Sequence, residues 1–177
     1  MATAPRKGFN PAKRVGSTTN NGGLTAYTIA SGYATGIGVG DSVKLHTDGT
    51  IIKGVNAASN LGVFAGCSYV DSAGRLTYAK NWPASTVATE IVAWVIDDPF
   101  CTFYIPASTA VTSVLPGQLY AVTITTPDTV TGRSTLVVDT SATVALASSM
   151  VKVIAVADVD NKILEVVLSN QLLRDNI

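Results

Sequence analysis

The sequence predicts an all-β protein, and three observations support this fold class. β-Branched and small residues are abundant, whereas glutamate, a strong helix former, occurs only at Glu90 and Glu165. Apolar and polar residues alternate over short runs, which is the period of a strand, and no long helical period occurs. Turn residues recur at intervals of roughly 8–12 residues. We therefore expect a single compact β-sandwich, jelly-roll or barrel-like domain with about ten to twelve short strands.

Length and composition restrict the class of protein further. A chain of 177 residues is long enough for one domain with a full core. Hydrophobic residues make up 47% and charged residues only 14% of the chain, and this excess predicts apolar surface that is buried against partners. No apolar run approaches the roughly 20 residues that cross a bilayer, and the N-terminus has no secretory core segment. We therefore expect neither a membrane partner nor secretion.

The first 24 residues are predicted to form an extended basic arm, followed by a β-rich body over residues 25–177. Pro5 and Pro11 disfavour a helix and a packed strand. The arm carries four bases before the first acid, Asp41, and the remaining eight bases and twelve acids leave the body at −4. Phe9 and Val15 are its only large apolar side chains between Met1 and Leu24. This segment is expected either to be disordered or to be ordered by a neighbour, with Arg6, Lys7, Phe9, Pro11, Lys13, Arg14 and Val15 as the candidate contact residues.

The first half of the body is predicted to contain a strand and two hairpins. Thr25 to Ala30 alternates weakly and fits a first strand. Asp41 to Lys53 fits a hairpin, because Asp48-Gly49 is a strong turn signal between two alternating runs. The strand from Leu61 to Tyr69 is expected to pair with residues 75–79. Trp82, which precedes a proline, is expected to be extended and either to cap a barrel end or to face a partner.

The stretch from Thr89 to Ile105 is predicted to be two strands joined by a tight turn. Asp97 and Asp98 precede Pro99, and we interpret both carboxylates as turn residues because Asp side chains bond their own downstream backbone. Further strands are expected at residues 119–125 and 136–138, and a last hairpin at residues 150–168. Residues 139–149 fit either a loop or one short helix.

Two short segments suggest a relationship between the two halves of the chain. Gly40-Asp41-Ser42-Val43 and Gly117-Gln118-Leu119-Tyr120 each begin a strand after a glycine. This similarity could mark two similar half-barrels.

No arrangement of residues predicts catalysis, a metal site or a cofactor. His46 is the only histidine, and its place beside a turn predicts a surface residue. Asp139, Asp158 and Asp160 lack the spacing of a calcium loop. Cys67 and Cys101 lie in strand-like runs and are expected to be small buried apolar residues, although their number allows a disulfide. The body is acidic, so we expect no nucleic-acid partner.

Several short motifs, taken in order, resemble those of the head decoration or cement proteins of tailed phages, in podoviruses and cyanophages. These motifs are Gly8-Phe9-Asn10-Pro11-Ala12-Lys13-Arg14, Val39-Gly40-Asp41-Ser42-Val43, Val95 to Ile105, Gly132-Arg133-Ser134 with Val138 to Ser141, and Asn170 to Arg174. The last of these is a shorter version of the family pattern, and the final hairpin is tighter than in that pattern.

The resemblance implies a non-enzymatic structural protein of the virion. Such a protein binds the outer surface of the capsid, with the major capsid protein as its partner, and stabilises it as a homotrimer. It would be made in the host cytoplasm. The alternative function is a β-sandwich fibre or attachment module that binds carbohydrate, since Trp82, Tyr69 and Tyr78 could form a sugar site. The sequence leaves the β topology, the oligomer number and the position on the shell open.

Overall fold

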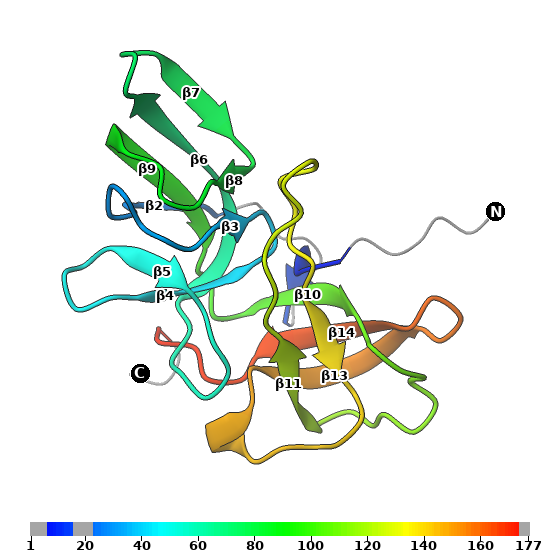
Figure 1. Ribbon diagram of the computed structural model, residues 1–177. Coiled ribbons are helices and arrows are strands. Elements are labelled where there is room, and N and C mark those ends of the chain that lie inside the picture. The colour runs from blue at the N-terminus through cyan, green and yellow to red at the C-terminus, as the bar shows by residue number, and fades with distance from the viewer. Residues whose placement is uncertain (1–6, 16–22, 174–177) are drawn as a thin grey trace.

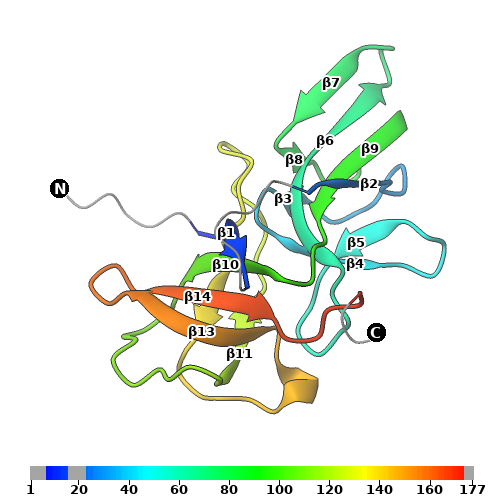
Figure 2. The same cartoon turned by 180° about the vertical axis from the view of Figure 1, so that it is seen from behind.

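The computed structural model describes residues 7–15 and 23–173, and these residues confirm the all-β class. Their strands fall into two groups that form two lobes side by side (Figures 1 and 2). The first lobe contains β2 (Thr25–Tyr27), β3 (Ile37–Gly38), β4 (Ser42–Leu45), β5 (Ile51–Lys53), β6 (Gly62–Asp71), β7 (Leu76–Ala79), β8 (Asn81–Trp82) and β9 (Ala88–Ile96). The second lobe contains β1 (Asn10–Arg14), β10 (Cys101–Pro106), β11 (Leu119–Thr123), β12 (Val137–Asp139), β13 (Val151–Asp158) and β14 (Ile163–Leu168).

Each lobe has one main antiparallel sheet and its own apolar core. The first sheet has the order β2-β9-β6-β4-β5, with β7 added to β6, and β3 pairs with β8 beside it. The second sheet has the order β1-β10-β14-β13-β11-β12. Trp82 and Phe64 are buried in the first core, and Phe103 and Leu136 are buried in the second.

The predicted hairpins around Asp48-Gly49, at residues 61–79 and at residues 150–168 are confirmed. They are β4–β5, β6–β7 and β13–β14, and each is antiparallel. The open choice at residues 139–149 resolves into a loop with one short 3-10 helix, Leu146–Ser148.

The predicted hairpin between residues 89 and 105 is wrong. β9 pairs with β6 and β2, whereas β10 pairs with β14 and β1, so the turn between them is the corner where the chain passes from one lobe to the other. The turn chemistry itself is present, because Asp98 accepts a hydrogen bond from the backbone N–H of Phe100 at 2.9 Å. Asp97 accepts hydrogen bonds from the hydroxyls of Thr25 and Tyr27 and joins this corner to β2. A strand, a turn and a strand have the same sequence pattern in a hairpin and in a corner.

Residues 7–15 differ from the expected separate arm, because they belong to the second lobe of this same chain. Asn10–Arg14 forms a strand that pairs with β10, with Pro11 opposite Phe103. β1 is an edge strand with β10 as its one neighbour, and an edge is the position in a sheet that tolerates proline, which has no N–H to donate. The remainder of the predicted arm, residues 1–6 and 16–22, lies outside the described residues.

The two lobes are built on the same strand plan. The order β2-β9-β6-β4-β5 in the first lobe corresponds, strand by strand in chain order, to β10-β14-β13-β11-β12 in the second. The first lobe adds β3, β7 and β8, and the second adds β1 at its edge. The suggested similarity of two halves is therefore present in the topology.

The β-sheet register follows the same correspondence, including one bulge. Phe64 pairs with Val95 and Gly66 with Trp94, so β6 bulges at Ala65. In the second lobe, Val153 pairs with Val166 and Ala155 with Glu165, so β13 bulges at the corresponding residue, Ile154. A bulge re-aims the strand that carries it, and the two sheets bend at the same position of the plan.

The glycine turns before β4 and β11 also match in detail. Gly40 and Gly117 have φ values of +90° and +89°. The N–H of Gly40 donates to the Phe64 carbonyl at 2.9 Å, and the N–H of Gly117 donates to Val153 at 2.8 Å. The residue after each glycine also forms a matching side-chain hydrogen bond. Asp41 accepts one from the backbone N–H of Gly38, and Gln118 accepts one from the backbone N–H of Leu115.

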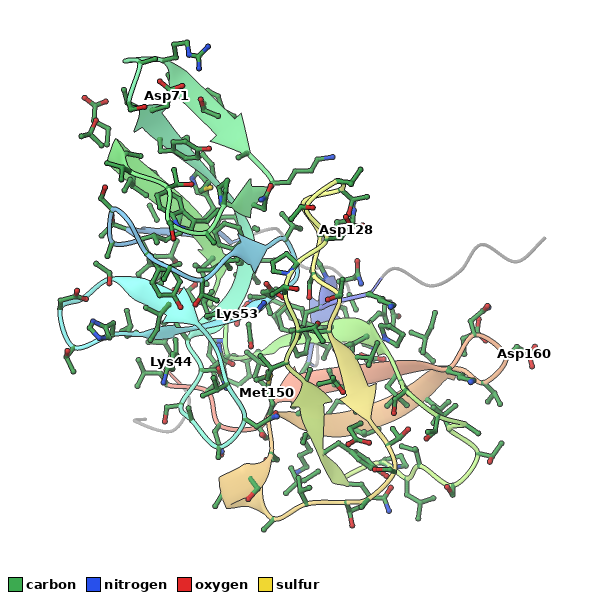
Figure 3. The ribbon with its side chains drawn as sticks, viewed as in Figure 1. Lys44, Lys53, Asp71, Asp128, Met150 and Asp160 are labelled. Atoms are coloured by element: carbon green, nitrogen blue, oxygen red, sulfur yellow. The ribbon has the colours of Figure 1, made fainter. Side chains whose placement is uncertain are left out.

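Polar contacts join the two lobes across their junction, where Lys53 and Met150 lie (Figure 3). Lys53 Nζ lies 2.9 Å from the carboxylate of the fully buried Asp41 and also donates to the carbonyl of Thr125 in the second lobe. The side chain of Asn56 exchanges two hydrogen bonds with the backbone of Val122, as a neighbouring strand would. The first lobe therefore attaches to β11 and the residues after it through side-chain hydrogen bonds to the backbone.

Candidate functional site

The predicted contact residues of the N-terminus divide into a buried part and an exposed part. Phe9 is only 2% exposed, and its ring meets that of Phe103 edge to face with centroids 5.7 Å apart. Phe9 is therefore a core residue of its own chain. Lys7, Pro11, Lys13, Arg14 and Val15 are exposed, and Arg6 lies outside the described residues.

The exposed bases of β1 already have acidic partners in the second lobe. Lys13 Nζ lies 3.2 Å from Glu165 Oε1, and Arg14 pairs with Asp98 at the inter-lobe corner. The backbone N–H of Val15 donates to the Phe100 carbonyl at 2.7 Å. These contacts hold the end of β1 against the corner. The clustered positive charge that the sequence suggested for a shell contact is thus partly neutralised.

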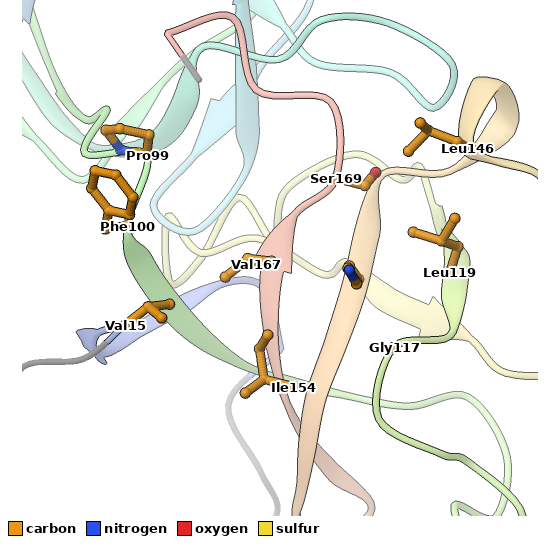
Figure 4. Close-up of a pocket in the computed structure, with 10 residues that line it drawn as sticks. Val15, Pro99, Phe100, Gly117, Leu119, Leu146, Ile154, Val167 and Ser169 are labelled. Carbon is orange, nitrogen blue, oxygen red and sulfur yellow. The ribbon is translucent and has the colours of Figure 1, made fainter. Parts of the chain in front are cut away.

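An apolar groove follows β1 on the outside of the second lobe (Figure 4). Its volume is about 540 Å³, and we call it the outer groove. It is lined by Val15, Pro99, Phe100, Gly117, Leu119, Leu146, Lys152, Ile154, Val167 and Ser169. Val15, Phe100 and Leu146 are each about half exposed. Lys152 is the one charged residue in the lining, so this groove suits an apolar partner with an acidic group.

A second apolar surface lies on the first lobe, where β6, β7 and β9 project beyond the rest of the molecule (Figure 1). Cross-strand pairing places Tyr78 and Val92 opposite Ser68, Leu76 opposite Val70, and Trp94 opposite Gly66. These residues share the outer face of the sheet because directly paired residues point to one side. We call this surface the blade face. Tyr78 is 73% exposed and Leu76 58% exposed.

Two aromatic rings on the blade face lie parallel to each other. The planes of Tyr78 and Trp94 differ by 5°, and their centroids are 6.5 Å apart. They come from β7 and β9, which flank β6, and Gly66 contributes no side chain to the strand between them. The sequence did not reveal Trp94 as a surface residue, because it lies in a run that is apolar on both faces of the strand. Its pairing with Gly66 depends on the bulge in β6.

Two of the aromatic residues proposed for a sugar site are buried. Trp82 is fully buried and meets the ring of Tyr69 at 5.3 Å between centroids. Trp82 therefore faces no partner, because β8 pairs with β3 over the first core. Of the three residues proposed from the sequence, Tyr78 alone is on the surface.

The described residues bring together no recognisable set of catalytic or metal-binding groups. No group of three or more His, Cys, Asp or Glu side chains among them could hold a metal ion. Asp139 and Asp158 accept hydrogen bonds from Ser141 and Asn161, and these bonds lower the pKa of each carboxyl. His46 is exposed beside Asp48, as predicted.

The two cysteines belong to different cores. Cys67 lies in the first core and Cys101 in the second, so they form no disulfide with each other. Burial raises the pKa of Cys67 to about 12 and that of Cys101 to about 11. Both side chains are therefore buried apolar groups that stay protonated, and the expectation of structural cysteines is confirmed.

The comparisons with known proteins leave the two surfaces as the basis for a functional proposal. Comparison of the chain with protein-family models, curated proteins and solved structures returned no match. Among the described residues, no helix has the length and apolar character needed to cross a membrane. The features that stand out are the blade face on the first lobe and the outer groove on the second.

Proposed function

We propose that this chain is a non-enzymatic structural protein of a phage virion that binds the outer surface of the capsid and stabilises it. The observation that carries the proposal is the blade face, a projecting sheet surface of aromatic and aliphatic side chains. Together with the motifs that resemble decoration proteins, it supports attachment to the major capsid protein. The same resemblance implies a homotrimer.

The physical character of the blade face fits a protein contact. Monomeric soluble proteins rarely expose large contiguous apolar patches, and such patches commonly mark an interaction site. Tyrosine and tryptophan dominate the binding energy of many interfaces because they bury a large area with few rotatable bonds. Tyr78 and Trp94 occupy the centre of this surface, with Leu76 and Val92 beside them.

A modest affinity per copy is sufficient for such a role. Subunits that bind a lattice and also contact each other gain effective concentration, so many weak contacts give strong overall attachment. The scarcity of charge in the chain favours contacts of this kind over an electrostatically steered association.

The test is co-sedimentation of the purified protein with undecorated, expanded phage heads. The full-length protein is expected to saturate at a fixed number of copies per head. Tyr78→Ser is expected to weaken binding at least tenfold, which is about 1.4 kcal/mol. Tyr104→Ser is the matched control, because Tyr104 is an exposed tyrosine on the second lobe. A folded full-length protein that fails to bind the heads would contradict the proposal.

A second candidate function, a carbohydrate-binding attachment module, is favoured by the parallel rings of Tyr78 and Trp94. Exposed aromatic rings with nearby polar groups form platforms on which sugar rings stack. Ser68 is the polar residue directly opposite Tyr78 on this face. Binding on a glycan array that is lost in Tyr78→Ala but kept in Tyr104→Ala would favour this function. An array with no signal above background would remove it.

A further inference from the structure

The outer groove has a counterpart inside the same molecule. The strand correspondence pairs each position of one face of the first lobe with a position in the second. The residues of that face in the first lobe are Gly40, Ser42, Val63, Ala65 and Ile96, and their counterparts are Gly117, Leu119, Lys152, Ile154 and Val167. All five counterparts line the outer groove.

In the first lobe this face is closed by the second lobe. Val63 and Ile96 are 1% and 7% exposed and belong to the core of the second lobe. The Ser42 hydroxyl lies 3.3 Å from the sulfur of Met150. The backbone of Phe9 crosses Gly40 so closely that a Cβ added there would lie 3.0 Å from the Phe9 carbonyl oxygen. An apolar residue on an extended backbone therefore covers this face.

In the second lobe the corresponding face is open at Gly117, Lys152 and Ile154, whereas Val167, the counterpart of Ile96, is buried. A Cβ built at Gly117 meets no described atom within 4 Å, in contrast to Gly40. Ile154, the counterpart of Ala65, is exposed above the groove floor. The same face of the strand plan is thus covered within the chain in the first lobe and lines a groove in the second.

The loop between β11 and β12 has the properties of an occupant for this groove. Val130 at its tip is 93% exposed, and the loop projects from the second sheet and runs beside β3 and β8 of the first lobe (Figure 1). Its backbone is held in place, because Asp128 Oδ1 accepts the N–H groups of Val130 and Thr131 and the Asp128 carbonyl accepts that of Gly132. Figure 3 places Asp128 on this projecting loop. An apolar tip beside a carboxylate is complementary to an apolar groove that contains Lys152.

We propose that the outer groove is an interface between copies of this chain, in which the Val130 loop of one copy enters the groove of the next and Asp128 approaches Lys152. A groove-to-groove contact would instead bring two Lys152 side chains together in apolar surroundings, which is unfavourable. The contact therefore joins two different surfaces, and in our proposal it runs head to tail from one copy to the next. Such contacts close into a ring or continue as an open chain.

This inference goes beyond the proposed function, because it uses the second lobe and leaves the blade face free. Attachment to heads and association in solution can therefore fail separately. A protein that assembles but does not bind heads would overturn the capsid proposal alone. A monomer that binds heads would overturn this inference and the homotrimer that the resemblance implies, and it would leave capsid binding standing.

The experiment is sedimentation velocity of the full-length protein up to about 0.1 mM, a range that populates contacts with micromolar Kd. The unaltered protein is expected to be oligomeric. Val130→Asp and Ile154→Asp are each expected to be monomeric, because the first loses the loop tip and the second blocks the groove. Val87→Asp is the control, since Val87 is an exposed valine on the first lobe, and it is expected to assemble normally.

Mixing the two monomeric variants tests the head-to-tail geometry. Val130→Asp keeps an intact groove and Ile154→Asp keeps an intact loop, so an equimolar mixture is expected to form a dimer and nothing larger. As a check that needs no charged substitution, Val130→Cys mixed with Ile154→Cys is expected to form an intermolecular disulfide under mild oxidation. A monomeric unaltered protein, or a mixture in which neither the dimer nor the disulfide forms, would overturn the proposal.

Discussion

The two lobes share a strand order, a β-bulge and a glycine turn, yet they present different surfaces. Their corresponding strands have little side-chain similarity beyond the paired glycines, Gly40 and Gly117. The backbone plan therefore persists while the side chains on each face change. In the first lobe, one face is adapted to pack against the second lobe. In the second lobe, the corresponding residues line a groove, where Gly117, Lys152 and Ile154 are exposed and Val167 is buried.

The additions to each lobe explain the remaining differences. The first lobe inserts β7 and β8 between β6 and β9, and this insertion extends the sheet into the blade. The second lobe gains β1, which covers the edge of β10 and supplies Phe9 to the junction. Each lobe thus carries one of the two apolar surfaces, the blade face or the outer groove, and these surfaces lie on different parts of the shared plan.

The largest expected effect is the loss of the buried ion pair between Lys53 and Asp41, which lies within the first lobe at its junction with the second. Lys53→Ala leaves the buried carboxylate of Asp41 without its cation and should lower the free energy of unfolding by about 3–5 kcal/mol. Lys44→Ala is the control, because Lys44 lies on the neighbouring strand and forms no ion pair within the described residues. Urea unfolding followed by circular dichroism measures both. Equal stability of the two variants would mean that this junction does not join the lobes.

A loss of similar size is expected from Phe9→Ala. Removing a buried phenylalanine side chain creates a cavity and typically costs about 3–5 kcal/mol. Val15→Ala, near the exposed end of the same segment, should change stability by less than about 0.5 kcal/mol. Thermal unfolding of the isolated protein provides the measurement. If Phe9→Ala unfolds like the unaltered protein, residues 7–15 are not part of the lobe and the arm predicted from the sequence regains support.

A smaller difference separates the two corresponding glycines. Gly117→Ala forces a side chain into a left-handed backbone and should cost about 1–2 kcal/mol. Gly40→Ala carries the same backbone cost and also presses against Phe9, so it should cost roughly 1 kcal/mol more. Parallel urea titrations would compare the two variants. A reversed order would contradict the closure of this face in the first lobe.

The sequence predicted much of the local structure because local structure has local signals. The turn at Asp48-Gly49, the final hairpin and the buried cysteines follow from turn chemistry and from alternation of apolar residues. The surface position of His46 follows from the same alternation. These features depend on a few neighbouring residues and are visible without the fold.

The features that were missed depend on pairing over long distances. The corner at Asp97-Asp98-Pro99 has the same pattern as a hairpin, and it becomes a corner because β2 and β1 occupy the strand edges that a hairpin would use. Pro11 argued against a strand, but an edge strand tolerates it. The blade face needs Trp94 and Tyr78 on two strands that flank β6, and the groove needs six segments. In the sequence, the repeated strand plan was indicated only by the similar segments GDSV and GQLY.

The most direct test of the central claim compares one position in each lobe by thiol labelling. Val63→Cys and Lys152→Cys place a cysteine at corresponding positions, and the native Cys67 and Cys101 stay silent because burial keeps their thiols protonated. At high dilution, Lys152→Cys is expected to react at the rate of a free surface thiol, whereas Val63→Cys is expected to react only as the protein unfolds. Equal labelling rates at the two positions would contradict the account, because the corresponding face would then be equally accessible in the two lobes.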